Sequence, residues 1–166
     1  MALEALESEE VPNPLDRVER IAETYQWAFD RTNQAEVTMR IEGGWSDMTV
    51  SLNWRDEFEL LHVAVNFDAK VPPARRDEAA RLLARINENL LCGHFDLWQA
   101  DGSLVFRNGL LLSGGADVND AQCEALIRFA VETCDRYFPA VQFVVWAGQN
   151  AEDALAASMI ETMGEA

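Results

Sequence analysis

The order in which helical and strand-like patterns follow one another constrains the fold of this chain more than any other feature. A helical pattern comes first, three strand-like runs follow, and then come a second helix, two short strands and a third helix. Strands joined by short turns pair as antiparallel neighbours, and the helices between them pack on the sheet. The order therefore predicts an α+β domain on a curled antiparallel five-stranded sheet, with helices mainly on one face.

The first half of the chain changes from helical to alternating spacing. Apolar residues at helical spacing predict a helix that begins near Pro14, capped by Asn13, and continues to about Arg31. Three alternating runs then predict strands, with turns at 43–44 and 55–56. The side chains expected to point into the core are Ala35, Val37, Met39, Ile41, Met48, Val50, Leu52, Trp54, Leu61, Val63, Val65 and Phe67.

The second half continues with helices around a hairpin. A helix after Pro73 has an apolar stripe that includes Leu82 and Ile86, and its Asp77 and Arg81 have the spacing of an ion pair. Asp101-Gly102 predicts a hairpin between two short strands. The third helix has a capping box, Asn119 with Gln122, and is expected to break at Pro139. A short terminal helix capped by Asn150 follows.

These patterns divide the chain into three parts. Residues 1–12 are expected to form a mobile acidic tail, because they contain four glutamates and few large apolar groups. Residues 13–148 form the α+β domain, and residues 149–166 form a C-terminal helical extension.

Composition excludes several classes of function. Hydrophobic residues make up 49% of the 166 residues, which is enough to build a core without a disulfide or a metal. The chain has 29 acidic and 13 basic residues and a formal net charge of −16. Nucleic acids and anionic membrane surfaces both attract basic proteins, so neither is an expected partner.

The expected location is the cytoplasm. The chain has three cysteines, an odd number, and their spacing matches no known pattern of disulfide bonds. We therefore interpret them as reduced residues, as in cytosolic proteins. The first ten residues are acidic where a secretory signal would be basic. No apolar run reaches the ~18 residues that a membrane-spanning helix needs.

Few residues suggest catalysis. His62, His94 and Asp96 are all predicted on the outer face of the sheet, away from the helices, and two histidines with a carboxylate can bind zinc. No HExxH or CxxC spacing supports such a site. Cys92 lies two residues before His94, and a cysteine near a histidine can act as a catalytic nucleophile. A cysteine in the turn at the end of a helix explains the same spacing without catalysis. We therefore expect no catalytic residue, no metal and no cofactor.

Two surfaces are candidates for partner binding. The first is a basic segment of sixteen residues that includes much of the second helix and contains Lys70, Arg75, Arg76, Arg81 and Arg85. It is either a solvated face with local ion pairs or a contact for an acidic partner such as a second copy of the chain.

The second surface is the outer face of the sheet, where large apolar groups stand among polar ones. A partner could cover it, or the C-terminal segment with Trp146 could fold over it. The candidate partner-binding residues on the two surfaces are Leu60, Ala64, Trp98, Val105, Arg75, Arg81 and Arg85.

Four segments carry a family resemblance. They are VPPARRDEAARLLARINENL at 71–90, GHFDL at 93–97, DGSLVFRNGL at 101–110 and DRYFPA at 135–140. In their order and spacing they resemble the YbjN-domain family, over about residues 14–148. The family is described as one of bacterial sensory transduction regulators, and it has no established catalytic residues to transfer to this chain.

The resemblance also implies a fold and a mode of action. The YbjN fold is similar to that of type III secretion chaperones, which are small, acidic, usually dimeric proteins that hold an extended peptide of a client. It therefore implies a homodimeric, regulatory or chaperone-like module that binds an unidentified protein or peptide client. The extension after Pro139 has no counterpart in the minimal chaperone fold.

An alternative function stays open. The chain could be an enzyme or a small-ligand-binding protein with a site that the sequence does not reveal. A deep polar pocket containing His62 or His94 would favour that alternative, whereas a shallow groove or a large two-fold interface would favour protein contact.

Overall fold

A computed structural model describes residues 12–164 of the chain, so the predicted acidic tail lies outside the described residues except for Pro12. The elements are α1 (Pro14–Thr24), β1 (Ala28–Asn33), β2 (Glu36–Glu42), β3 (Asp47–Arg55), β4 (Leu60–Lys70), α2 (Arg76–Asn87), β5 (His94–Leu97), β6 (Ser103–Leu111), α3 (Asp120–Val145) and α4 (Ala151–Gly164). Two short 3-10 helices, Asp56–Phe58 and Pro73–Arg75, precede β4 and α2.

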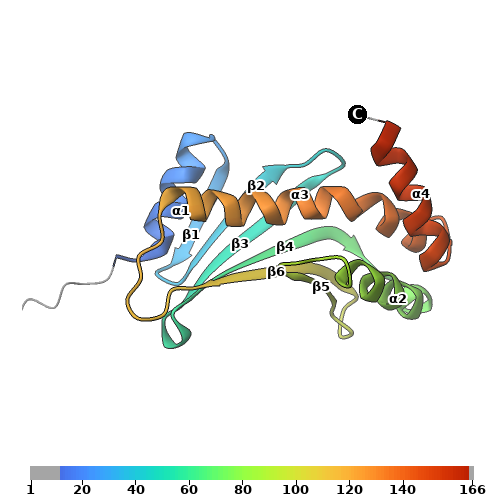
Figure 1. Cartoon of the computed structure of the whole chain (residues 1–166), viewed down its shortest axis with the longest axis horizontal. Coiled ribbons are helices and arrows are strands. Elements are labelled where there is room, and N and C mark those ends of the chain that lie inside the picture. The colour runs from blue at the N-terminus through green and yellow to red at the C-terminus, as the bar shows by residue number, and fades with distance from the viewer. Residues whose placement is uncertain (1–11, 165–166) are drawn as a thin grey trace, which may run out of the picture.

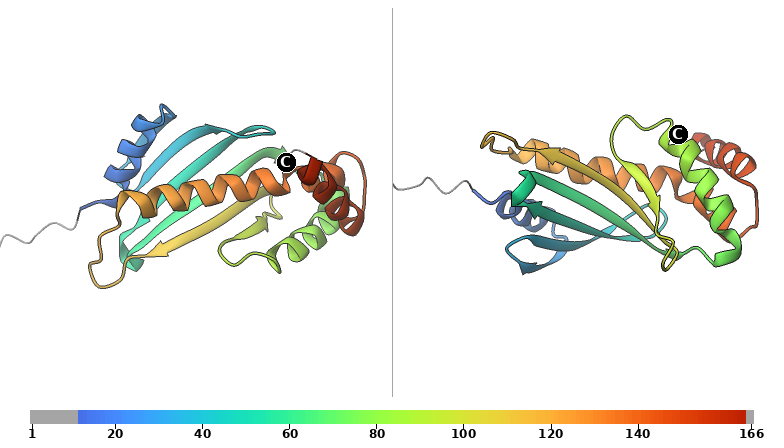
Figure 2. Two further views of the ribbon diagram at one scale, coloured as in Figure 1. Left: turned by 45° about the horizontal axis from the view of Figure 1, so that its top comes forward. Right: turned by 90° about the horizontal axis from the view of Figure 1, so that it is seen from below.

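The fold is α+β, as predicted, with one antiparallel sheet in the order β1-β2-β3-β4-β6-β5. Helices α1 and α3 lie along one face of this sheet, and α2 and α4 pack together at one end of it (Figure 1). Among residues 12–164, no helix lies on the other face, and the right panel of Figure 2 shows β6 and β4 in front of α3.

The sheet has six strands rather than the predicted five, because the first helix ends at Thr24 instead of Arg31. Gln26 takes a left-handed conformation, with φ of 58°, and turns the chain back on itself. Phe29 and Arg31 then alternate in a strand that pairs with β2. Helical and alternating spacing overlap over such a short aromatic segment, and pairing with β2 decides between them.

The core lies between the sheet and α1 and α3. The side chains predicted to point inward from the three central strands are buried, except for exposed Ala35 and half-buried Trp54. On β4, Leu61, Val63 and Val65 have no exposed surface. This alternation fixes the register of β4, because a one-residue slip would move the whole set to the opposite face.

Helix α3 continues through Pro139, so the predicted break there is wrong. Proline inside a helix removes one backbone hydrogen bond and costs about 3 kcal/mol. Here Phe138, Pro139 and Ala140 are all buried, and that burial offsets the lost bond. The continued helix brings Trp146 next to the ring of Phe138, with their centroids 6.3 Å apart.

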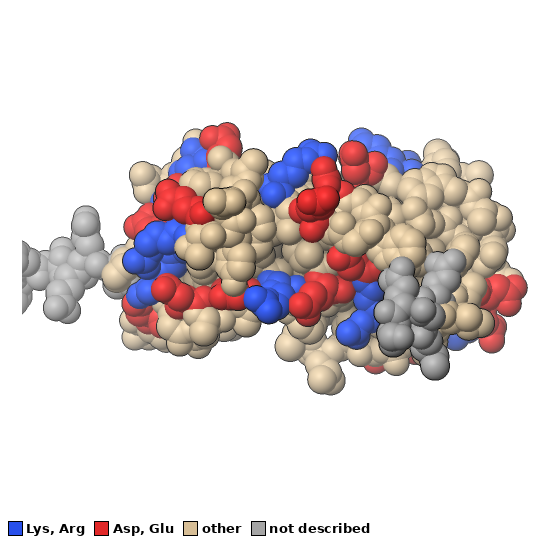
Figure 3. All heavy atoms as spheres, turned by 90° about the horizontal axis from the view of Figure 1, so that it is seen from above, with Lys and Arg blue, Asp and Glu red and all other residues tan. Residues whose placement is uncertain are grey.

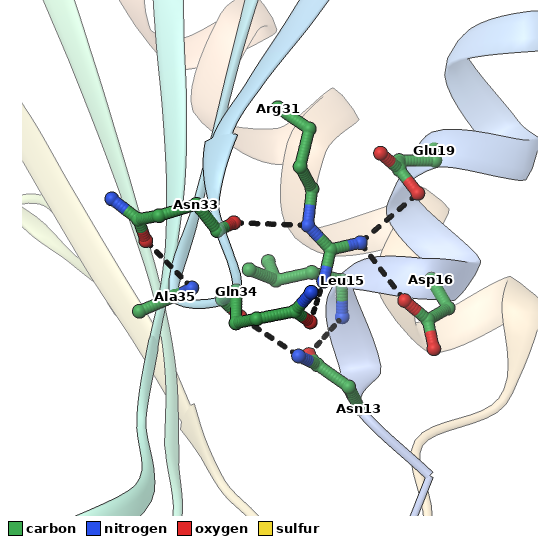
Figure 4. Close-up of polar contacts among 8 residues, drawn as sticks. All are labelled: Asn13, Leu15, Asp16, Glu19, Arg31, Asn33, Gln34 and Ala35. Atoms are coloured by element: carbon green, nitrogen blue, oxygen red, sulfur yellow. Dashed lines mark hydrogen bonds and ion pairs between the residues drawn. The ribbon is translucent and has the colours of Figure 1, made fainter.

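Arg31 joins the first helix to the first hairpin (Figure 4). Its Nη1 donates to Asp16 Oδ1 at 2.8 Å and to Glu19 Oε2 at 3.0 Å, both on α1. Its Nε donates to the backbone oxygen of Asn33 at 3.0 Å. Only 17% of the Arg31 side chain is exposed, so these charge-assisted bonds are partly shielded from water. The contact fixes the N-terminal end of α1 against β1.

Replacing Arg31 with methionine should lower the free energy of unfolding by about 1 to 2 kcal/mol, because hydrogen bonds to charged groups at a part-buried site are lost. Chemical denaturation followed by circular dichroism measures the change. The matched control is Arg40→Met on β2, whose ion pair with Asp47 spans 3.6 Å and is exposed. The control should stay within about 0.5 kcal/mol of the parent. Equal effects of the two substitutions would contradict this account of Arg31.

Candidate functional site

The helices leave the outer face of the sheet, opposite α1 and α3, uncovered (Figure 2). Two interpretations of this face were open: a partner covers it, or the C-terminal segment does. Helix α4 packs against α2 and α3, at the end of the sheet, and does not cross the outer face. Within the described residues, the second interpretation is therefore wrong.

Strand register places one set of side chains on this face. Asn53 pairs with His62, and Arg55 pairs with Leu60, across β3 and β4. Ala64 pairs with Arg107 across β4 and β6. Paired residues in an antiparallel ladder project to the same side of the sheet.

These side chains surround a hollow of about 470 Å³, which we call the outer-face hollow. It runs along β4, with Phe58 at the Leu60 end and Trp98 beyond Ala64 at the other end. Its lining residues are Asn53, Arg55, Phe58, Leu60, His62, Ala64, Trp98 and Arg107.

The turn between β5 and β6 holds Trp98 in place. Gly102 donates its N–H to the Trp98 oxygen at 2.8 Å, and Trp98 donates to the Ser103 oxygen at 2.9 Å. Gly102 has φ of 76°, and a Cβ there would lie 2.3 Å from the Val71 oxygen, so only glycine fits. Hydrogen bonds from the hydroxyl and the backbone of Ser103, and then one from Lys70, lower the pKa of Asp101 to about 2.

Both histidines of the chain belong to one polar cluster at the side of the hollow. Arg107 Nε donates to His62 Nε2 at 3.3 Å, and Arg107 Nη1 lies 3.3 Å from Asp96 Oδ2. His94 Nε2 lies 3.2 Å from the same Asp96 oxygen. Burial lowers the pKa of His62, and the positive charges of Arg107, His94 and Arg55 lower it further. The lowered pKa favours the neutral imidazole of His62 at pH 7, and the two guanidinium groups of the hollow, of Arg55 and Arg107, are each paired with a carboxylate, of Glu57 and Asp96.

The described side chains include no group of three or more His, Cys, Asp or Glu that could hold a metal ion. Cys92 is exposed before β5, and Cys123 and Cys134 are buried. Burial raises the pKa of Cys123 to about 11 and also raises that of Cys134, which disfavours the reactive thiolate. The outer-face hollow offers hydrogen-bond donors beside apolar groups.

The structure separates the seven predicted partner-binding residues. Leu60, Ala64 and Trp98 line the outer-face hollow. Val105 is on the same face by its register with Asn66, but only 1% of it is exposed, so a partner cannot reach it directly.

The predicted basic residues lie elsewhere, at the end of the sheet. Arg75 donates to the backbone oxygens of Val144 at 2.8 Å and Gln149 at 2.5 Å. It therefore holds the end of α3 and is not free to bind a partner. Arg81 pairs with Glu78, three residues before it, at 3.0 Å, rather than with the predicted Asp77. Arg85 is exposed beside a second hollow, of about 530 Å³, between α2 and α4.

Three comparisons relate this fold to known proteins. The sequence profile of the YbjN family, described as "Putative bacterial sensory transduction regulator", matches residues 14–143. The chain belongs to the YbjN family. Its structure is similar to the crystal structure titled "Crystal structure of YbjN, a putative transcription regulator from E. coli", with a TM-score of 0.56 and 19% identity over 75% of this chain and 87% of that chain. No curated protein matches the sequence.

The comparisons confirm the predicted resemblance to the YbjN family. The identity to the solved YbjN structure is low, so that similarity shows a shared fold and assigns no residue a role. Within residues 12–164, no helix is long and apolar enough to cross a membrane.

Sequence reasoning missed Arg107 and Phe58 as lining residues. Arg107 could have been found, because it is two residues from Val105 in a predicted strand and shares its face. Phe58 could not, because it belongs to a 3-10 turn where alternation does not apply. It is 61% exposed, which is unusual for a phenylalanine.

Replacing Arg75 with methionine should lower the free energy of unfolding by about 1 to 3 kcal/mol, since two carbonyls at the end of α3 lose their donor. Urea denaturation measures the change. Arg85→Met is the matched control, because Arg85 is on α2, the helix that follows Arg75, and is exposed, and it should change stability by less than about 0.5 kcal/mol. An Arg75 variant as stable as the control would show that these bonds do not hold α3.

Proposed function

We propose that this chain is a non-catalytic regulatory module that acts by holding a segment of a client protein on the outer face of its sheet. The observation that carries the proposal is Trp98, which is 49% exposed at one end of the outer-face hollow. Tryptophan is enriched at the centres of protein interfaces, where it supplies most of the binding energy. A half-exposed tryptophan held by a fixed turn suits such a role.

The shape and lining of the hollow support a peptide or protein client. Phe58, Leu60 and Trp98 provide apolar contacts along its length, and Arg55, Asn53 and Arg107 provide hydrogen-bond donors beside them. Interfaces commonly combine an apolar centre with a polar rim. An extended segment laid along β4 would place successive side chains against both kinds of group.

The opposite face carries charges of both signs. Figure 3 shows acidic and basic side chains interspersed over α1 and α3, without a broad area of either sign. Several of these charges are paired with one another, among them Arg17 with Asp117 at 2.7 Å and Arg128 with Glu124.

Family and fold agree with this proposal. The YbjN family is described as a regulator, and regulators act largely through contact with other proteins. The similarity of the YbjN fold to that of type III secretion chaperones adds an analogy, because those chaperones hold extended client peptide. By the same analogy, we propose that the chain is a homodimer and works in the cytoplasm.

A small-ligand site is the second candidate. His62, Arg107, Asp96 and His94 form a connected polar cluster, and two of them line the hollow. A guanidinium beside a neutral imidazole could bind a small molecule with an anionic group. Exposed Phe58 and Trp98 at the two ends of the hollow favour a longer, peptide-like ligand over a compact one.

Replacing Trp98 with alanine should remove capture of the client from an extract of the native cell, with a loss of more than about 1 kcal/mol in affinity. Affinity capture with quantitative mass spectrometry measures it, and circular dichroism verifies the fold. Trp45→Ala is the matched control, since Trp45 is 41% exposed at the turn between β2 and β3 and should leave capture unchanged.

Two results would contradict this function. Capture that Trp98→Ala leaves at the parent level would place the contact surface elsewhere. Loss of the same proteins from both tryptophan variants would indicate non-specific adsorption to exposed indole rings.

The proposed homodimer predicts twice the mass of one chain in light scattering at micromolar concentration, because closed two-fold dimers are the commonest homo-oligomers. A dimer of moderate affinity should dissociate on dilution, so mass is measured over a concentration series. A monomer mass at every accessible concentration would refute the dimer and leave the client proposal standing.

A further inference from the structure

A groove lies on the helix side of the sheet, between α3 and the turn that joins α1 to β1. The left panel of Figure 2 shows α1 and α3 diverging over the sheet, with strands visible between them. The groove has a volume of about 170 Å³, and we call it the helix-side groove. None of its lining residues lines the outer-face hollow. They are Tyr25, Trp27, Ile41, Glu124, Ile127, Arg128, Val131 and Glu132.

Apolar groups line much of the groove, and the local structure holds them in place. Ile41 of β2 and Ile127 of α3 are buried, with 5% and 1% of their surface exposed, so they form its base. The rings of Tyr25 and Trp27 are stacked, with centroids 4.9 Å apart and an angle of 15° between their planes. Trp27 also donates its backbone N–H to the Ala22 oxygen of α1 at 2.9 Å. The groove is therefore preorganised, which reduces the entropy lost on binding.

Three charged side chains of α3, four residues apart, line the groove. Glu124 accepts a hydrogen bond from the Tyr25 hydroxyl at 2.6 Å and forms an ion pair with Arg128. Arg128 is also four residues from Glu132, but its guanidinium pairs with Glu124. Among the ion pairs of residues 12–164, none includes Glu132, which is exposed. The groove therefore offers one carboxylate with an unmatched charge beside an apolar surface.

The group that complements this arrangement is a cation at the end of an aliphatic stem. Lysine and arginine side chains pack such a stem on apolar surface while the charged head meets water or a carboxylate. A volume of about 170 Å³ suits a single side chain, since pockets for drug-sized molecules measure ~300–1,000 Å³. The formal net charge of −16 also attracts a basic protein. The ligand class is therefore a basic side chain that another protein presents.

We propose that the helix-side groove binds a basic side chain of a partner protein. The aliphatic stem packs against Ile41, Ile127 and Val131, and the cationic head pairs with Glu132. This contact is on the opposite side of the sheet from the outer-face hollow, and it does not depend on the client proposed for that hollow. One molecule can then hold a client on one face and a second, basic protein on the other.

Methyl NMR on the full chain tests this proposal. The δ1 methyl groups of isoleucine are isotope-labelled, and the probe is the peptide acetyl-Ala-Ala-Lys-Ala-Ala-amide. We expect the methyl resonances of Ile41 and Ile127 to shift, with a saturable dependence on peptide concentration. Ile86 is the internal control, because it is buried on α2, at the end of the sheet, and should not shift. Shifts confined to other isoleucines, or no saturable shift at Ile41 and Ile127, would overturn the proposal.

A second peptide tests the role of the cation. Norleucine replaces lysine in it and keeps the aliphatic stem without the ammonium group. This peptide should bind about 2- to 5-fold more weakly, which is the contribution of an exposed ion pair. Equal or tighter binding of the norleucine peptide would show that the groove selects apolar groups alone, and that result contradicts the proposal.

Charge variants locate the partner of the ammonium group. Glu132→Gln should raise the Kd of the lysine peptide by about 2- to 5-fold and leave that of the norleucine peptide unchanged. Glu88→Gln is the matched control, because it removes the same charge from an exposed position at the end of α2. Circular dichroism verifies that both variants fold. Equal weakening by both variants, or none by Glu132→Gln, would overturn the assignment to Glu132.

A small amine is the other source of the same chemistry. n-Pentylammonium chloride carries the stem and the ammonium group without a peptide backbone. We expect it to bind more weakly than the lysine peptide, because the backbone adds contacts beside the groove. Binding as tight as that of the peptide would assign the groove to a free amine and overturn the protein partner.

The Trp98→Ala variant separates this inference from the proposed function. It should bind the lysine peptide with the affinity of the parent, since Trp98 lines the hollow on the other face. If the peptide leaves Ile41 and Ile127 unshifted while Trp98→Ala removes client capture, the inference fails and the function stands. If the peptide shifts both methyls while Trp98→Ala keeps client capture, the inference stands and the function fails.

Discussion

The alternation of side chains along β4 is the constraint on which the rest of the structure depends. Leu61, Val63 and Val65 have no exposed surface, which ties this strand to the layer that contains α3. The same register forces His62 and Ala64 onto the opposite face, where no helix covers them. Burial on one side thus determines what is offered to a partner on the other, because successive residues of a strand must face opposite ways.

Arginine serves two separate purposes in this acidic chain. Arg31 and Arg75 hold elements together, the first by joining α1 to β1 and the second by binding carbonyls at the end of α3. Arg55 and Arg107 instead line the outer-face hollow, each beside one carboxylate. A planar guanidinium suits both purposes because it donates several hydrogen bonds in fixed directions.

Much of the fold could be predicted from the sequence, because the repeating patterns are local. Five of the six strands, the inward set on β3 and β4 and the capping box of α3 all follow from alternation or from cap residues. The errors fall where local signals conflict. Phe29 fits both a helix and a strand, Pro139 breaks isolated helices but not one held by a core, and Arg81 has two acids within reach.

The sequence by itself determined the fold class and the placement of Trp98 on the outer face of the sheet, because the two-residue period of a strand assigns a face to every side chain. Only the tertiary structure decided that Val105 is buried there, that Arg75 is committed to α3 and that α4 packs away from this face. It also brought Arg107, His62 and Asp96 together from three strands. Such contacts join residues far apart in the chain, and their partners depend on how whole elements pack.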